Sequence, residues 1–128
     1  MKVCLLSHIS KSYAPTYPFQ LFLKSRSDDV FSIFHPLIDS GIQKTTIEKK
    51  NKKKYIKFSK VNFFSYFLNF YINLKHCLIH DKFDMIFGLN PLNTLSAIIL
   101  KFLGRTRLVV YYYVDYSENN FQNFTFNL

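Results

Sequence analysis

Polar side chains that could bind a hydroxylated or anionic ligand follow short apolar runs at several points in this sequence. A histidine there can donate a hydrogen bond or titrate near neutral pH, and a carboxylate can accept a hydroxyl group or a proton. An asparagine at the start of a helix favours anions and hydroxyl ligands. The polar residues at these points, together with one glycine, are Ser7, His8, His35, Gly88, Asn90, Asp115 and Tyr116. The pattern predicts where a ligand site lies and leaves the chemistry of the ligand open.

These candidates also have simpler roles, which the sequence leaves open. Asn90 precedes Pro91, and capping alone explains this pair because Asn is a good N-cap and Pro fits the first helical position. His8 could be an ordinary loop histidine, and Asp115 could cap a helix that follows it. The three tyrosines before Asp115 fit the propensity of a strand and need no ligand.

Metal and nucleotide sites have weak support. His76 and His80 are four residues apart, a spacing that lets two imidazoles on one helix reach a metal ion. The glutamate of the metalloprotease pattern is missing beside His76, so we expect solvated histidines and no metal. The sequence contains neither a dinucleotide fingerprint nor a P-loop, so we also expect no cofactor.

The formal net charge of +9 is concentrated in one lysine-rich stretch. Clustered lysines can contact nucleic acid or anionic lipid headgroups, or they can form a solvated turn that protects a sheet edge. No aromatic platform accompanies them, which disfavours nucleic acid and leaves an anionic membrane surface as the possible partner. The anionic-surface candidates are Lys49, Lys50, Lys52, Lys53 and Lys54.

The elements that must position these residues follow one another as β, α, β, hairpin, α, β, α, β. An Asn cap, an amphipathic run and Gly104 predict a helix over 91–103. A strand, this helix and a further strand form a βαβ unit, which implies parallel strands. Strands are predicted at 2–7, 84–89 and 107–114. An open α/β sheet binds ligands at the carboxyl ends of its strands, which is where the candidate residues lie.

The stretch 61–80 predicts one long helix with an unusual distribution of polar residues. Its polar positions are Asn62, Ser65, Asn69, Asn73, His76 and His80, spaced by three or four, so they share one stripe. The length suits a transmembrane helix, but the asparagines, histidines and Lys75 are costly in hydrocarbon. We predict a largely buried helix with solvated histidines, and partial membrane contact is the alternative.

Length and cysteine content predict one intracellular domain. A chain of 128 residues that is 48% apolar can form one core. Cys4 and Cys77 lie in different predicted elements without framework spacing, which indicates free buried thiols in a reducing cytoplasm. The apolar run at the amino terminus is too short for a signal peptide.

Residues 84–123 resemble the amino-terminal domain of GT-B-fold glycosyltransferases, in particular the family 4-like group. One branch carries a strand ending in Gly-x-Asn/Asp-Pro/Ser-Leu-Asn, followed by a small-residue helix and a Gly-Arg/Lys turn. A Val-Val-Tyr-Tyr strand comes next, and then Asp-Tyr-Ser before Arg/Asn-Phe-x-Asn. The matching positions are Gly88, Asn90, Pro91, Leu92, Asn93, Gly104, Arg105, Val109, Val110, Tyr111, Tyr112, Asp115, Tyr116, Ser117, Phe121 and Asn123. The stretches MKVCLLSHI and FHPLIDSG also look like the first two strands of that domain. The resemblance covers nearly the whole chain and is loose between residues 41 and 74.

The resemblance implies one partial Rossmann-like parallel sheet with flanking helices, the amino-terminal half of a GT-B fold. Such a domain mainly binds the acceptor, and a second domain binds the nucleotide-sugar donor. We therefore expect a single incomplete domain over 1–128, with a hairpin excursion at about 41–60, that is inactive alone because the donor-binding domain is absent. Many relatives have, after the Val-Val-Tyr-Tyr strand, a histidine that contacts the donor sugar. This chain has Val114 in that neighbourhood, so the contact cannot be assigned to it.

The function implied by the resemblance is that of a truncated glycosyltransferase from polysaccharide or glycoconjugate assembly. The intact form would transfer a sugar from a nucleotide-sugar donor to a glycan or lipid-linked acceptor, with a missing carboxyl-terminal domain or another chain completing the site. We expect a cytoplasmic protein that is peripheral on the inner membrane face. The alternative is a non-catalytic remnant or a small basic interaction module. The acceptor-side candidates are Ser7, His8, Gly88, Asn90, Asp115 and Tyr116.

Overall fold

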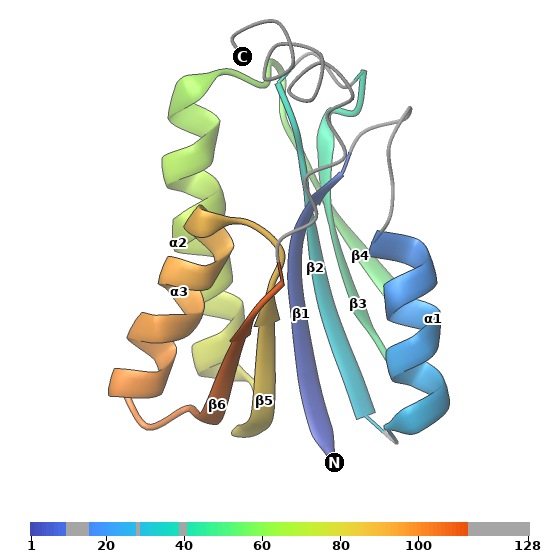
Figure 1. Cartoon of the computed structure of the whole chain (residues 1–128). Coiled ribbons are helices and arrows are strands. Elements are labelled where there is room, and N and C mark those ends of the chain that lie inside the picture. Colours follow the sequence, from blue (N-terminus) through green and yellow to red (C-terminus); the bar gives the residue numbers. More distant parts are fainter. Residues whose placement is uncertain (10–15, 28, 39–40, 113–128) are drawn as a thin grey trace, which may run out of the picture.

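The protein is an α/β structure with a six-stranded mixed sheet and three helices (Figure 1). This computed structural model describes residues 1–9, 16–27, 29–38 and 41–112. Its elements are β1 (Lys2–Ile9), α1 (Thr16–Arg26), β2 (Asp29–Pro36), β3 (Lys44–Lys49), β4 (Lys52–Lys57), α2 (Phe63–Ile79), β5 (Phe83–Gly88), α3 (Pro91–Phe102) and β6 (Thr106–Tyr111). This succession confirms the predicted order of elements.

The strand order is β4-β3-β2-β1-β5-β6. The four strands β2, β1, β5 and β6 are parallel, whereas β3 and β4 form an antiparallel hairpin beside β2. The parallel pairing of β5 with β6 confirms the predicted βαβ unit. Helix α1 covers one face of the sheet, and α2 and α3 cover the other (Figure 1).

The central strands are buried on both faces because helices cover both sides. In β1, Cys4 and Leu6 belong to the core under α2 and α3, whereas Val3 and Leu5 belong to the core under α1. This alternation reflects the period of two in a strand. A continuous apolar run is what a strand covered on both faces requires.

Local signals fix the ends of α3. The side-chain oxygen of Asn90 accepts from the backbone N–H of Asn93 at 2.9 Å, and Pro91 takes the first helical position. Gly104 follows the helix with a φ of 69°, in the left-handed region where a side chain is strained. The predicted cap, start and stop of this helix are therefore confirmed.

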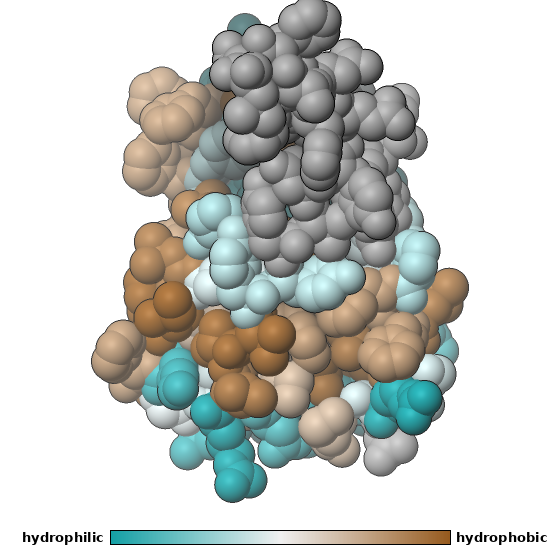
Figure 2. Space-filling view, in the orientation of Figure 1, coloured by the Kyte–Doolittle hydropathy of each residue, from teal (hydrophilic) through white to brown (hydrophobic). Residues whose placement is uncertain are grey.

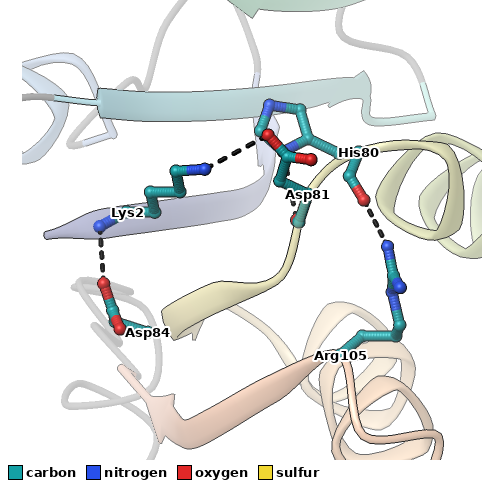
Figure 3. A network of polar contacts seen from close by, with 5 residues as sticks. All are labelled: Lys2, His80, Asp81, Asp84 and Arg105. Carbon is teal, nitrogen blue, oxygen red and sulfur yellow. Dashed lines mark hydrogen bonds and ion pairs between the residues drawn. The ribbon is translucent and has the colours of Figure 1, made fainter.

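Polar contacts tie together the loops at the amino-terminal edge of the parallel strands (Figure 3). The backbone N–H of Lys2 donates to Asp84 at 2.8 Å, and its ammonium pairs with Asp81 at 3.1 Å. Arg105 donates to the backbone carbonyl of His80. These contacts link the start of β1 to the residues that begin β5, and the loop before β6 to the end of α2.

The lysine-rich stretch forms a tight hairpin turn between β3 and β4. Lys50 and Asn51 have φ values of 48° and 64°, as a primed two-residue turn requires. Lys49 pairs with Phe31 near the start of β2, so this turn lies at the end of the sheet away from the carboxyl ends of the parallel strands. β4 is an edge strand with exposed lysines, which disfavours pairing with another chain.

Helix α2 is oriented opposite to the prediction. Its polar residues Ser65, Asn69 and Asn73 are buried, and the outer face consists mainly of exposed apolar side chains. His80, the cap residue after the helix, is also buried, with ring centroids 4.7 Å from those of Phe31 and Phe83. The predictions of a largely buried helix and of a solvated His80 are therefore wrong. The physical reason is that hydrogen bonds to the strand ends hold the polar stripe inside.

None of the helices in the described part of the chain is long and apolar enough to cross a membrane.

The two cysteines are free and buried, as predicted. Their sulfur atoms lie 3.8 Å apart, between β1 and α2. Burial raises the pKa of the Cys4 thiol, so this thiol is a core group rather than a reactive one.

Candidate functional site

The carboxyl ends of β1 and β5 lie side by side and bring His8 next to the start of α3. Leu6 pairs with Gly88, and the backbone N–H of Leu89 donates to the carbonyl of Leu6 at 3.0 Å. A Cβ atom on Gly88 would lie 2.7 Å from the backbone of Thr94. Gly88 therefore permits α3 to approach the strand closely, and this approach places Asn90 beside His8.

Three asparagine side chains surround the imidazole of His8. Its Nδ1 lies 2.5 Å from Nδ2 of Asn90 and 3.1 Å from Nδ2 of Asn93. Its Nε2 lies 3.2 Å from the side-chain amide of Asn69 on α2. The ring thus joins the β5–α3 turn to the polar stripe of α2.

The hydrogen bonds of these asparagines fix the tautomer of His8. Asn90 uses Oδ1 to cap α3, and Asn93 uses Oδ1 to accept from Asn73 at 2.9 Å. Both amides therefore present N–H groups to Nδ1, which must accept, so the proton of the neutral ring is on Nε2. Asn69 must then present its oxygen to Nε2–H. This orientation also gives a partner to Asn69 Oδ1, a buried atom that otherwise has none among the described residues.

The polar contacts continue from His8 into the core. Asn73 accepts from His35 Nε2–H at 2.7 Å, and Nδ1 of His35 lies 3.0 Å from the hydroxyl of Thr45. Asn73 also donates to Ser96 at 3.3 Å. We call this set the buried polar network: His8, His35, Thr45, Asn69, Asn73, Asn93 and Ser96. Buried polar groups are costly unless they are paired, and here the pairing joins α2, α3 and the sheet.

Both histidines of the network are neutral at physiological pH. Burial lowers the pKa of His8 to about 4. Burial and then the neighbouring charge of His8 lower the pKa of His35 to about 3. His8 therefore does not titrate near neutral pH, which was one of its two predicted roles, and it acts as a neutral hydrogen-bonding group.

A pocket of about 320 Å³ opens beside His8. The ring of Tyr66 on α2 meets the ring of His8 edge-on, with centroids 5.4 Å apart. The lining residues are His8, Leu37, Tyr66, Asn90, Pro91 and Leu92. Apolar walls with a few convergent polar groups are typical of small-molecule sites.

The structure brings together only some of the predicted acceptor-side residues. His8 and Asn90 line the pocket, and Gly88 shapes the turn beneath it. Ser7 does not reach the pocket, because alternate side chains of a strand point to opposite faces. It is buried, and its hydroxyl lies 2.8 Å from that of Thr16 at the start of α1. Asp115 and Tyr116 lie outside the described residues.

The anionic-surface candidates are remote from this pocket. They are Lys49, Lys50, Lys52, Lys53 and Lys54, on the hairpin at the opposite end of β2. Any role they have is therefore separate from the chemistry of the pocket.

Sequence reasoning missed the contributions of α2 and of Asn93. Tyr66 lines the pocket, while Asn69 and Asn73 hold the histidines. The signal was present, because the stripe of α2 contains asparagines rather than the Lys and Glu of a solvated helix face. Short amides at helical spacing can be satisfied in a core by partners on a sheet.

The chain matches no family model, no curated protein and no solved structure. The function must therefore be argued from the geometry of the pocket and from the motif residues that form it.

Proposed function

We propose that the chain is the acceptor-side part of a GT-B-type glycosyltransferase and that the pocket beside His8 binds a sugar ring of the acceptor. The observation that carries the proposal is the convergence of His8, Asn90 and Tyr66 in one pocket. Asn90 belongs to the Gly-x-Asn-Pro-Leu-Asn motif on which the resemblance rests. The pocket also occupies the place where open α/β sheets bind ligands.

The chemistry of the pocket suits a neutral polyol. Asn90 commits its oxygen to the cap and one N–H to His8, which leaves the second N–H of its amide for a ligand hydroxyl. Tyr66 offers an aromatic surface and a hydroxyl group. Among the described residues that line this pocket, none is acidic.

His8 acts as a positioning residue in this proposal. With a pKa of about 4, its imidazole is a poor match to proton transfer at neutral pH, where the best catalytic pKa is near the operating pH. Its role is to hold the Asn90 amide in one orientation. The transferred sugar would come from a nucleotide sugar bound by a second domain, and the present chain would orient the acceptor hydroxyl.

Saturation-transfer difference NMR with a panel of methyl glycosides and disaccharides tests the proposal. We expect saturable transfer from the protein to at least one pyranoside, because weak acceptor binding at millimolar concentration suffices for this method. Asn90→Ser keeps an N-capping oxygen but removes the amide donors, so it should abolish the transfer. Tyr66→Ala should also abolish it, while Tyr71→Ala on the exposed face of the same helix should have no effect.

Two outcomes would contradict the proposal. One is the absence of transfer to every sugar in the panel. The other is a signal that Asn90→Ser and Tyr66→Ala leave intact, since the sugar would then bind elsewhere. Either outcome favours the reading of the chain as a non-catalytic remnant or interaction module.

A further inference from the structure

The amphipathicity of α2 is inverted relative to that of an ordinary surface helix. A helix on a sheet normally buries its apolar stripe and exposes its polar one. Here Ser65, Asn69 and Asn73 of the polar stripe are buried, together with two apolar residues of the core. Phe63, Phe64 and Phe67 are 65%, 77% and 64% exposed. The outer face of α2 comprises Phe63, Phe64, Phe67, Leu68, Tyr71, Lys75, Leu78 and Ile79. The rings of the three phenylalanines contact one another and do not pack into the core.

Helix α3 extends this apolar surface. It packs beside α2 on the same face of the sheet and exposes Leu95, Ile98 and Phe102, followed by Leu103. We call the exposed apolar residues of α2 and α3, together with Leu103, the α2–α3 apolar face. Figure 2 shows hydrophobic side chains gathered along the side of the molecule that these helices form. Contiguous exposed apolar surface of this kind marks an interaction site.

The charges around this face are positive. Neither α2 nor α3 contains an Asp or a Glu, and their charged residues are Lys75 and Lys101, both exposed. Burial and then the charges of Lys54 and Lys75 lower the pKa of His76, so Lys54 of β4 borders the same helix. Of the described acidic groups, Glu48 is buried on the α1 side, and Asp29 and Asp84 lie at the amino-terminal edge of the strands. Asp81 follows the end of α2 and is paired with Lys2.

We infer that the α2–α3 apolar face docks onto the surface of an anionic lipid bilayer. An apolar helical face with phenylalanines and a basic border is the pattern of helices that lie in the membrane interface. The phenylalanines would enter the boundary between headgroups and acyl chains, and the lysines would contact phosphates. A second copy of the chain is a poor partner, because it would bring two basic borders together. This inference does not rest on the proposed function.

A tryptophan reporter tests the inference directly, since the native sequence contains no Trp. We expect Phe64→Trp fluorescence to shift to shorter wavelength with vesicles of phosphatidylcholine and phosphatidylglycerol. Vesicles of phosphatidylcholine alone should cause a smaller shift, and high salt should reduce it. Phe22→Trp on α1, whose native side chain is 53% exposed, is the matched control and should not shift.

Vesicle flotation measures the contribution of each group. Replacing Phe63, Phe64 and Phe67 with Ser should weaken binding by at least about tenfold, because each buried ring contributes a large transfer free energy. Lys75→Gln and Lys101→Gln should each weaken binding roughly fivefold. Leu21→Ser with Phe22→Ser on α1, and Lys57→Gln on edge strand β4, are matched controls that should bind like the native chain. Lys57 is exposed and points to the face of the sheet opposite to Ile56, which packs in the core under α2.

The inference is overturned if the native chain ignores anionic vesicles while its circular dichroism shows a folded protein. It is also overturned if the α1 control loses binding as strongly as the phenylalanine variant. Sedimentation adds a third outcome. A dimer that the phenylalanine variant converts to a monomer, without vesicle binding by the native chain, would assign the face to a second copy.

Discussion

Asn90 Nδ2 lies 2.5 Å from His8 Nδ1, although the two residues are 82 positions apart in the chain. The contact joins the carboxyl end of β1 to the first turn of α3. It combines two functions in one amide, because the Asn90 oxygen caps the helix while its nitrogen holds the imidazole. The geometry of the pocket therefore depends on the same residue that starts the helix.

Asn90→Asp separates these two functions. Aspartate is a good N-cap and its charge suits a helix N-terminus, so the free energy of unfolding should change little at neutral pH. The carboxylate next to His8 favours the imidazolium form, so the pKa of His8 should rise above about 4. Asn90→Ala should instead destabilise the protein by about 1 kcal/mol through loss of the cap. NMR titration of the His8 ring and urea unfolding measure the two effects, and an unchanged His8 pKa in Asn90→Asp would argue against the contact.

Acid should weaken the fold before the carboxylates titrate. Burial lowers the pKa values of His8 and His35 to about 4 and about 3 from 6.5, so the unfolded chain binds protons that the folded chain does not. Above about pH 6.5, the pKa of histidine in the unfolded chain, these groups do not reduce the free energy of unfolding. Below it, the free energy of unfolding falls as the pH drops from about 6.5 toward 4. We expect the free energy of unfolding to decrease between about pH 6.5 and pH 5.

His35→Gln tests the assignment of that pH dependence. It should reduce the slope in this range by about half, because His8 still contributes. His76→Gln should retain most of the slope because His76 is only partly buried. Urea unfolding at several pH values supplies the measurement. A slope that persists unchanged in His35→Gln would show that other groups cause it.

Two asparagines on the same face of α2 should differ in their contribution to stability. Asn73→Leu leaves His35 Nε2–H and Asn93 Oδ1 without their partner, and each unpaired buried group costs about 1–3 kcal/mol. Asn69→Leu removes a single contact, with His8. We therefore expect the larger loss of unfolding free energy for Asn73→Leu, and equal losses would contradict the buried polar network.

Gly88→Ala should displace α3. Its Cβ would lie 2.5 Å from Oγ1 and 2.7 Å from the backbone of Thr94, and such overpacking costs about 1–3 kcal/mol. Because the close contact includes backbone atoms, adding Thr94→Ala should rescue only part of the loss. Gly104→Ala is the control, since its Cβ meets open space and only its φ of 69° opposes the change. The Asn90 side-chain amide signals should move in Gly88→Ala and stay in place in Gly104→Ala.

The sequence predicted the elements well where local chemistry decides them. The cap at Asn90, the stop at Gly104 and the lysine-rich turn of the predicted hairpin are local signals, and each element they predict is present. The strand order and the association of His8 with α2 depend on contacts between distant residues, which periodicity alone does not specify.

The orientation of α2 shows most clearly where sequence reasoning failed. Periodicity identified its two faces, but the assumption that the polar face meets water reversed them. The deciding contacts, such as His35 with Asn73, pair residues 38 positions apart. For the same reason, Tyr66 was not among the predicted site residues, because α2 was not expected to contribute to the pocket.

The side-chain amide of Asn90 is the most direct probe of the central claim that the pocket beside His8 binds a sugar. In a ¹⁵N-labelled chain titrated with the best pyranoside of the panel, we predict saturable shifts of the Asn90 side-chain N–H signals and of the Leu92 backbone amide. The side-chain amide of Asn51, in the exposed turn between β3 and β4, should not move. Signals of Asn90 that stay unchanged, or shifts confined to residues outside the pocket, would contradict the claim.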